Sequence, residues 1–156
     1  MQITLIAVGK CRKPYVREGI GDYAGRIGHY ASLDQIEVAE ERGSKGVGSA
    51  EVVRREGERI LNATPGNAFT VALDLGGKPA SSRDLAQRLS DLGLSGSSRV
   101  VFWIGGAFGL AQDVLKAADW RLSLSTMTFP HEIARLVLLE QVYRAFTIIR
   151  GESYHK

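Results

Sequence analysis

Cysteine, histidine and long apolar runs are all scarce in this chain of 156 residues. Its single cysteine, Cys11, excludes an internal disulfide, and the separate positions of His29, His131 and His155 give no Cys/His spacing typical of a zinc site. We therefore expect no structural metal. No apolar stretch approaches the roughly 20 residues of a membrane span. The N-terminus also lacks the pattern of a signal peptide, so we expect a cytoplasmic protein that does not associate with membranes.

Common catalytic motifs are absent as well. There is no G-x-S-x-G motif, and the scattered histidines offer no Ser/His/Asp or Cys/His arrangement, which argues against the usual hydrolases. Residues 75–79 (LGGKP) lack the upstream glycine and the Ser or Thr of a phosphate-binding loop, so we expect a turn there. Basic neighbours would lower the pKa of the Cys11 thiol, but the sequence supplies no base or resolving thiol for it.

The composition is that of an ordinary globular domain. Hydrophobic residues make up 44% and charged residues 24%, which argues against a disordered or fibrous protein, and the length suits one domain over residues 1–156. The net charge of +3 permits an anionic partner such as RNA. Two basic clusters are either phosphate contacts or solvated helix faces: Lys10, Arg12, Lys13 and Arg17, and further on Arg54, Arg55 and Arg59.

Strand and helix patterns alternate along the chain. Short apolar runs predict strands at residues 3–8, 36–38, 69–73, 100–104 and 120–127. Helical spacing predicts helices at 14–29, 50–61, 112–118 and 131–149. A capping box of Ser81 and Asp84 starts another helix that ends at Gly93, and residues 40–49 are expected to form a long loop. This order predicts an α/β fold with a mostly parallel sheet of about five strands. The ligand site then lies beyond the carboxyl ends of the strands.

The loops at those carboxyl ends contain the most informative residues. Residues 104–109 (IGGAFG) lack the glycine spacing of a dinucleotide-binding motif and form either a tight strand-to-helix turn or a cofactor loop. Residues 124–131 combine hydroxyl and apolar side chains, as expected around an adenosine-like ligand. A helix cap is the alternative for that segment.

The C-terminal third combines an apolar helix with a polar tail. The predicted helix 131–149 is apolar around most of its circumference, which indicates burial on both sides and a dimer interface. Its polar stripe is Glu140, Arg144 and Thr147, and the Glu140–Arg144 pair is either structural or used in catalysis or at the interface. The tail contains Tyr154 and His155, residue types that stack on bases and contact phosphate, unless the tail is merely solvated.

Taken together, several of these segments resemble one family. VGK at 8–10, the paired Gly105 and Gly106, MTFPH at 127–131, EQVYRAF at 140–146 and YHK at 154–156 resemble bacterial methyltransferases of the SPOUT (α/β-knot) superfamily. The family in question modifies N3 of a pseudouridine in 23S rRNA. The resemblance covers essentially the whole chain. One departure is Ala107 and Phe108, which replace a more polar pair in the glycine turn.

The resemblance implies a SPOUT-type α/β knot with a C-terminal trefoil knot. It also implies a homodimer, S-adenosyl-L-methionine as cofactor, no metal, and the 23S rRNA of the assembled 70S ribosome as substrate. The cofactor-binding residues that it implies are Leu73, Gly105, Leu124, Ser125, Thr126, Met127, Thr128 and Phe129.

The resemblance also gives roles to the C-terminal polar residues. Arg144 would stabilise the negative charge on the base, and Glu140 or His155 would accept the N3 proton. Tyr154 and His155 of one subunit would complete the site of the other. Two alternatives stay open, namely a non-catalytic RNA- or ribosome-binding factor with this fold, and a SPOUT enzyme that methylates a ribose or a different base.

Overall fold

The computed structural model describes residues 1–42 and 46–156. Within them, one sheet of five strands has the order β2-β1-β4-β3-β5, and every neighbouring pair is parallel. The strands are β1 (Gln2–Val8), β2 (Ser32–Val38), β3 (Phe69–Pro79), β4 (Arg99–Ile104) and β5 (Trp120–Ser123). The helices are α1 (Pro14–Ile27), α2 (Ser49–Ala63), α3 (Ser82–Leu94), α4 (Gln112–Ala117) and α5 (His131–Ile149). The predicted α/β architecture is confirmed.

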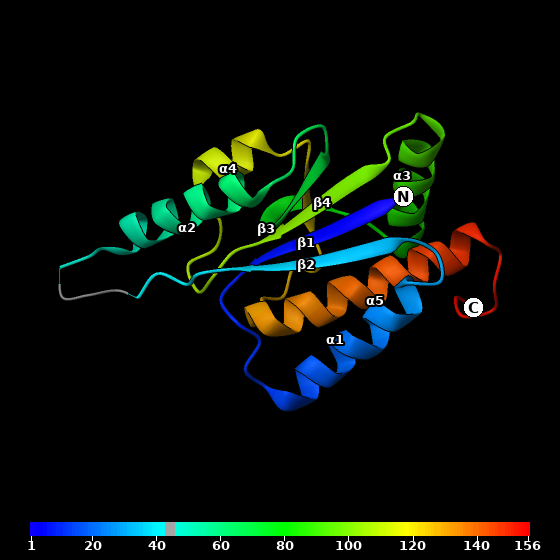
Figure 1. Cartoon of the computed structure of the whole chain (residues 1–156), viewed down its shortest axis with the longest axis horizontal. Coiled ribbons are helices and arrows are strands. Elements are labelled where there is room, and N and C mark those ends of the chain that lie inside the picture. The colour runs from blue at the N-terminus through cyan, green and yellow to red at the C-terminus, as the bar shows by residue number, and fades with distance from the viewer. Residues whose placement is uncertain (43–45) are drawn as a thin grey trace.

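Helices cover both faces of the sheet, because the central strands are apolar on both sides. Along β1, Ile3 and Leu5 belong to one buried cluster, and Ile6 and Val8 belong to the other. Residues of α1, α3 and α5 complete the first cluster, and residues of α2 and α4 complete the second. Figure 1 accordingly shows α1 and α5 on one side of the sheet and α2 and α4 on the other.

Three predictions for the strands need correction, and the first is the strand predicted at residues 36–38, which already begins at Ser32. The turn predicted at residues 75–79 is wrong, because β3 shifts register after Leu73 and resumes at Lys78 beside Leu122 of β5. A Cβ atom at Gly77 would lie 2.7 Å from backbone atoms of Arg121, so this close approach of the two strands needs a glycine. The strand predicted to reach residue 127 ends at Ser123, whose hydroxyl donates a hydrogen bond to the carbonyl of Ser125 (3.0 Å) and closes a turn.

The observed bounds of the helices lie closer to the predicted ones than those of the strands do. α5 has the predicted bounds, α1 ends two residues early, and Gly93 lies inside the last turn of α3 instead of after it. The capping box of α3 is confirmed, since the Asp84 amide donates to Ser81 Oγ (3.2 Å) and the Ser81 amide donates to Asp84 Oδ2 (2.8 Å). Of the loop predicted at 40–49, residues 43–45 lie outside the described residues, and α2 already begins at Ser49.

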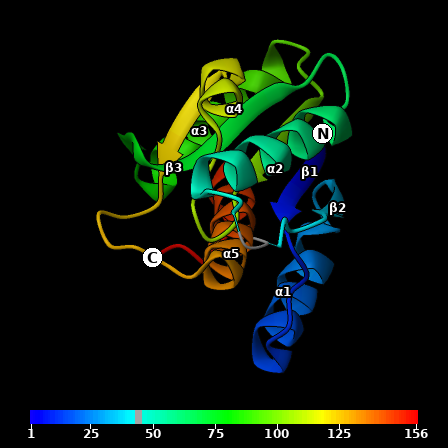
Figure 2. The ribbon, with the colours of Figure 1, turned by 90° about the vertical axis from the view of Figure 1, so that its left-hand side faces the viewer.

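The carboxyl ends of the strands all face one edge of the molecule, as parallel pairing requires. Figure 2 looks at this edge and shows that the β1–α1 connection and the first turns of α2 and α5 lie there. The trefoil knot stays a prediction, because strand order and pairing do not determine how the chain threads. In the described residues, no helix is long and apolar enough to cross a membrane.

Candidate functional site

Three segments meet around one cavity of about 780 Å³ at the carboxyl edge of the sheet. Two of them follow β4 and β5, and the third is the segment of residues 73–75 at the register shift inside β3; the loop after β1 contributes no lining residue. Seven of the eight predicted cofactor-binding residues line the cavity, whereas Thr126 lies outside its lining. The seven are Leu73, Gly105, Leu124, Ser125, Met127, Thr128 and Phe129.

The glycine turn after β4 forms one wall of this cavity. A Cβ atom at Gly105 would lie 2.4 Å from the carbonyl oxygen of Gly109, a distance that a real side chain does not tolerate. The turn is closed by a hydrogen bond from the Gly109 amide to the Gly106 carbonyl (3.1 Å). The segment is therefore a tight strand-to-helix turn, as one alternative predicted, and it lines the cavity; its use as a cofactor loop stays a prediction.

The loop after β5 forms the opposite wall. Ser125 Oγ accepts a hydrogen bond from the Met127 amide (2.9 Å), which fixes the local backbone. Pro130 is the N-cap of α5, and no side chain in the described residues caps that helix, so the alternative of a helix cap is wrong. Three large apolar side chains of the lining stay open to solvent, Met127 (74% exposed), Phe108 (62%) and Leu75 (58%), and they give the mouth of the cavity an apolar rim.

Two polar groups at this cavity, Asp74 and His131, were not among the predicted cofactor-binding residues. Asp74 lines it directly after Leu73, and Arg121 of β5 donates to Asp74 Oδ2 from Nε (3.1 Å). The only signal for Asp74 was its place after a predicted strand. His131, the first residue of α5, also lines the cavity. The wall therefore joins apolar side chains with hydroxyl groups, one carboxylate and one imidazole.

The predicted catalytic residues form a second cluster, on α5 and the C-terminal tail. Glu140 Oε1 accepts hydrogen bonds from Arg144 Nε (3.0 Å) and from the Tyr154 hydroxyl (3.1 Å), and Glu140 Oε2 accepts one from Gln141 (2.6 Å). Arg144 Nη1 lies 3.5 Å from His155 Nδ1, and the guanidinium carbon lies 4.6 Å from the centre of the Tyr154 ring. The hydrogen bond and ion pair with Glu140 raise the pKa of Arg144. Its charge is thus held in place between a carboxylate and an aromatic ring.

Aromatic side chains hold the tail against α1 and α5, so the tail is not merely solvated. The rings of Tyr154 and Tyr143 meet edge to face at 4.7 Å, and the Tyr154 hydroxyl lies 3.4 Å from that of Tyr23. Burial, with hydrogen bonds to Tyr23 and Glu140, raises the pKa of Tyr154. Nearby, the Tyr30 hydroxyl donates to Glu152 (2.6 Å), which raises the pKa of Tyr30 to about 12.

The cavity and the catalytic cluster lie at different places along α5. Ala134 lines the cavity, whereas Glu140 and Arg144 follow six and ten residues later. At 1.5 Å per residue, they are roughly 9 to 15 Å further along the helix axis. Within one chain, therefore, the structure gathers the predicted cofactor residues and the predicted catalytic residues into two separate groups.

Cys11 is not an activated thiol. Its Sγ lies 3.3 Å from Glu132 Oε2, and burial together with this carboxylate raises the pKa of the thiol, whereas its basic neighbours had suggested a lowered one. Across residues 1–42 and 46–156, no group of three or more His, Cys, Asp or Glu residues could hold a metal ion.

The chain is similar to known proteins over nearly its whole length. A family model described as "Predicted SPOUT methyltransferase" matches residues 1–155. The chain is 49% identical to the ribosomal RNA large subunit methyltransferase H of Carboxydothermus hydrogenoformans over 159 residues, and 46% identical to that of Bifidobacterium adolescentis over 160 residues. Each of these alignments covers 100% of both chains.

Two solved structures are similar in fold. The "Probable Methyltransferase from Bordetella pertussis Tohama I" has a TM-score of 0.57 at 13% identity and covers 92% of this chain and 95% of its own. A methylase family protein from Haemophilus influenzae Rd KW20 has a TM-score of 0.52 at 14% identity and covers 99% of this chain and 70% of its own. At such low identity the likeness concerns the fold alone.

Proposed function

Because the chain belongs to the SPOUT methyltransferase family, we propose that it transfers a methyl group from S-adenosylmethionine to N3 of a pseudouridine in 23S rRNA. The substrate is the assembled 70S ribosome in the cytoplasm, and residues 1–156 act as one domain. The relatives at 49% and 46% identity are named as methyltransferases of the large-subunit ribosomal RNA. The observation that carries the proposal is the cavity formed by the loops after β4 and β5 together with residues 73–75 of β3.

The lining of the cavity suits this cofactor. A volume of about 780 Å³ is within the usual range for a small-molecule site, and apolar walls with a few hydroxyl groups suit an adenosine group. Leu73, Gly105 and residues 124–129 would hold the cofactor, and Asp74 offers an acceptor for ribose hydroxyl groups. When bound, S-adenosylmethionine supplies an electrophilic methyl group.

The second cluster supplies the chemistry at the acceptor base. N3 of a uracil-type base is a good nucleophile only after it loses its proton, so the site must stabilise the base anion. Arg144 would do this through its fixed positive charge. Since Glu140 already accepts hydrogen bonds from Arg144, Tyr154 and Gln141, its role is to orient Arg144. That leaves His155 to accept the proton.

A homodimer would bring the two groups of residues together. In one chain they lie apart along α5, so the tail and Arg144 of one subunit would act beside the cavity of the other. The apolar surface that α5 leaves only half-buried or exposed is suited to an interface between subunits. It comprises Ile133, Leu136, Val137, Ile148 and Ile149.

Mixing two inactive variants tests this shared site. One lacks residues 154–156, and the other carries Gly105→Ala in the cavity wall. At a concentration of S-adenosylmethionine that saturates the wild-type cavity but not that of Gly105→Ala, each variant alone should transfer little methyl group. Dimers reassembled from an equal mixture should recover about a quarter of the wild-type rate, because half of the dimers are mixed and each has one intact site. Full activity of the truncated variant alone would refute the role of the tail, and no recovery from correctly folded mixed dimers would refute the shared site.

A non-catalytic RNA- or ribosome-binding factor is the alternative, and cofactor binding separates the two. Calorimetry with S-adenosylmethionine should give a saturable binding isotherm for the wild-type protein. Ribosome binding without any cofactor binding would instead support the non-catalytic factor.

A further inference from the structure

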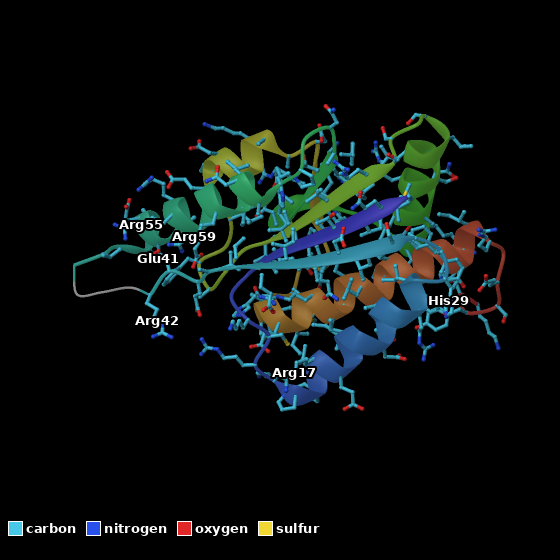
Figure 3. The ribbon with its side chains drawn as sticks, in the orientation of Figure 1. Arg17, His29, Glu41, Arg42, Arg55 and Arg59 are labelled. Carbon is cyan, nitrogen blue, oxygen red and sulfur yellow. The ribbon has the colours of Figure 1, made fainter. Side chains whose placement is uncertain are left out.

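The two basic clusters differ in whether acidic side chains pair with their cations, and this difference indicates which cluster can bind the phosphates of RNA. In the cluster on α2, Arg54 pairs with Glu51 (2.8 Å), Arg55 pairs with Glu51 and Glu41, and Arg59 pairs with Glu41. The pKa of Glu51 falls to about 2 because both neighbouring arginines donate to it. Figure 3 shows Arg55 and Arg59 close to Glu41. These guanidinium groups are neutralised within the protein and offer little to a phosphate.

The cluster after β1 keeps most of its positive charge. Lys10, Lys13 and Arg17 are exposed, and none of the three has an ion-pair partner in the described part of the chain. Arg12 does have one, Glu40, at 3.4 Å. Arg17 lies near the start of α1, on the opposite side of the molecule from the neutralised arginines of α2 (Figure 3).

An exposed aromatic ring lies beside Lys13, one of these cations. Tyr15 is 62% exposed, and Lys13 Nζ lies 5.9 Å from the centre of its ring. Unpaired cations beside an exposed aromatic ring are the combination that binds single-stranded nucleic acid, because phosphates contact the cations and an unstacked base lies on the ring.

Buried charges on α5 fix the backbone that presents these side chains. Glu132 Oε2 accepts hydrogen bonds from the amides of Arg12 (3.1 Å) and Lys13 (3.0 Å). Arg135 is only 3% exposed and donates to the carbonyl oxygens of Val8 and Gly9, both at 2.6 Å. The segment from residue 8 to residue 13 is therefore held in one conformation before any ligand arrives.

The same turns of α5 border the proposed cofactor cavity. His131 and Ala134 line the cavity, while Glu132 and Arg135, each one residue further along, hold the segment after β1. In the sheet, β1 also lies next to β4, whose glycine turn lines the cavity. A nucleic acid bound to the basic segment would pass close to the cofactor.

We propose that Lys10, Lys13, Arg17 and Tyr15 form the surface that binds a single-stranded loop of the substrate RNA, with the cations on phosphates and the tyrosine ring against a base. Glu132 and Arg135 are positioning residues that keep this surface beside the cofactor cavity. The proposal rests on the proposed function for the identity of the RNA, but binding can be measured without turnover.

The test compares two variants that each lose three positive charges. One is Lys10→Ala/Lys13→Ala/Arg17→Ala, and its matched control is the triple alanine variant of three cations placed elsewhere, Arg88, Arg99 and Lys116. Filter binding to 70S ribosomes is measured over a range of salt concentrations. The first variant should bind at least about tenfold more weakly than wild type. Its log–log salt slope should be shallower by about 2, since each single-strand phosphate contact contributes about 0.7.

Further readouts separate binding from folding and from catalysis. Thermal melts confirm that both triple variants are folded, and S-adenosylmethionine affinity should be the same in both. Tyr15→Phe should bind ribosomes like wild type, whereas Tyr15→Ala should bind about tenfold more weakly, because only the former keeps the ring. Equal ribosome affinity and equal salt slope for the two triple variants would overturn the proposal. If these binding differences are found but the wild-type protein transfers no methyl group, the proposed function is overturned and the binding proposal is kept.

Discussion

The clearest stability prediction concerns the buried guanidinium of Arg135. We consider Arg135→Met, which keeps much of the apolar length and removes every donor. Two charge-assisted hydrogen bonds disappear, those to the carbonyl oxygens of Val8 and Gly9, and each is worth about 1.5–3 kcal/mol. The third partner, Glu37, is 41% exposed in its side chain and regains water, so its loss adds at most about 1 kcal/mol.

Part of this cost is offset. A buried guanidinium has a desolvation penalty, and the Nε atom of Arg135 has no hydrogen-bond partner among the described residues. We therefore expect a net loss of about 3 kcal/mol in the free energy of unfolding. For a chain of this length, that corresponds to a melting temperature lower by about 6–12 °C.

Urea and thermal unfolding measure this loss, and Glu37→Gln is the matched control. The control keeps Arg135 and both carbonyl contacts, so its unfolding free energy should fall by less than about 1 kcal/mol. The reasoning is refuted if Arg135→Met costs less than about 1 kcal/mol, or if Glu37→Gln costs as much as Arg135→Met.

Three further predictions concern the cavity, the buried carboxylate and a helix cap. Gly105→Ala should weaken S-adenosylmethionine binding by at least about tenfold in calorimetry, because its Cβ would collide with Gly109. The control Gly21→Ala should bind like wild type, because its Cβ would meet nothing within 4 Å. Equal affinities of the two variants would contradict the account of the turn. The pKa of Glu132 is lowered, chiefly by the Lys13 amide, so the stability that its carboxylate contributes is present above the unfolded value of 4.5 and is lost as the pH falls through the folded pKa. In acid unfolding experiments, the free energy of unfolding should therefore fall more steeply with decreasing pH below about 4.5 for wild type than for Glu132→Gln. Parallel curves of this free energy against pH would disprove the prediction. Ser81→Ala should cost about 1 kcal/mol in urea unfolding, since it removes the cap of α3, and no loss would mean that the capping box contributes nothing.

Local patterns were sufficient for most of the fold and for the cofactor side of the site. The bounds of α5 followed from its apolar pattern after Pro130, and the loops of the cavity followed from the rule that ligands bind at the carboxyl ends of parallel strands. The second half of β3 was missed because LGGKP has the composition of a turn. Its pairing with β5 depends on a register shift that only the neighbouring strand determines.

The long-range contacts of the C-terminal helix and tail were beyond sequence reasoning. Glu132 and Arg135 look like ordinary surface charges of a helix, yet they are buried against the segment after β1, some 120 residues earlier in the chain. Tyr154 contacts Tyr23 across a similar separation. Such pairs depend on where α5 crosses the other elements, which no local pattern encodes. The same holds for the charge compensation of Arg55 and Arg59 on α2, because Glu41 reaches them from outside their helix.

The most direct test of the account identifies the nucleoside that receives the methyl group. Purified protein is incubated with methyl-labelled S-adenosylmethionine and 70S ribosomes that lack the modification, with free 23S rRNA in parallel, and the digested RNA is analysed by mass spectrometry. The account predicts N3-methylpseudouridine from the ribosomes and none from the free RNA. Label on a ribose or on another base would contradict the proposed acceptor, and no label from a protein that binds neither cofactor nor ribosome would contradict the proposed function as a whole.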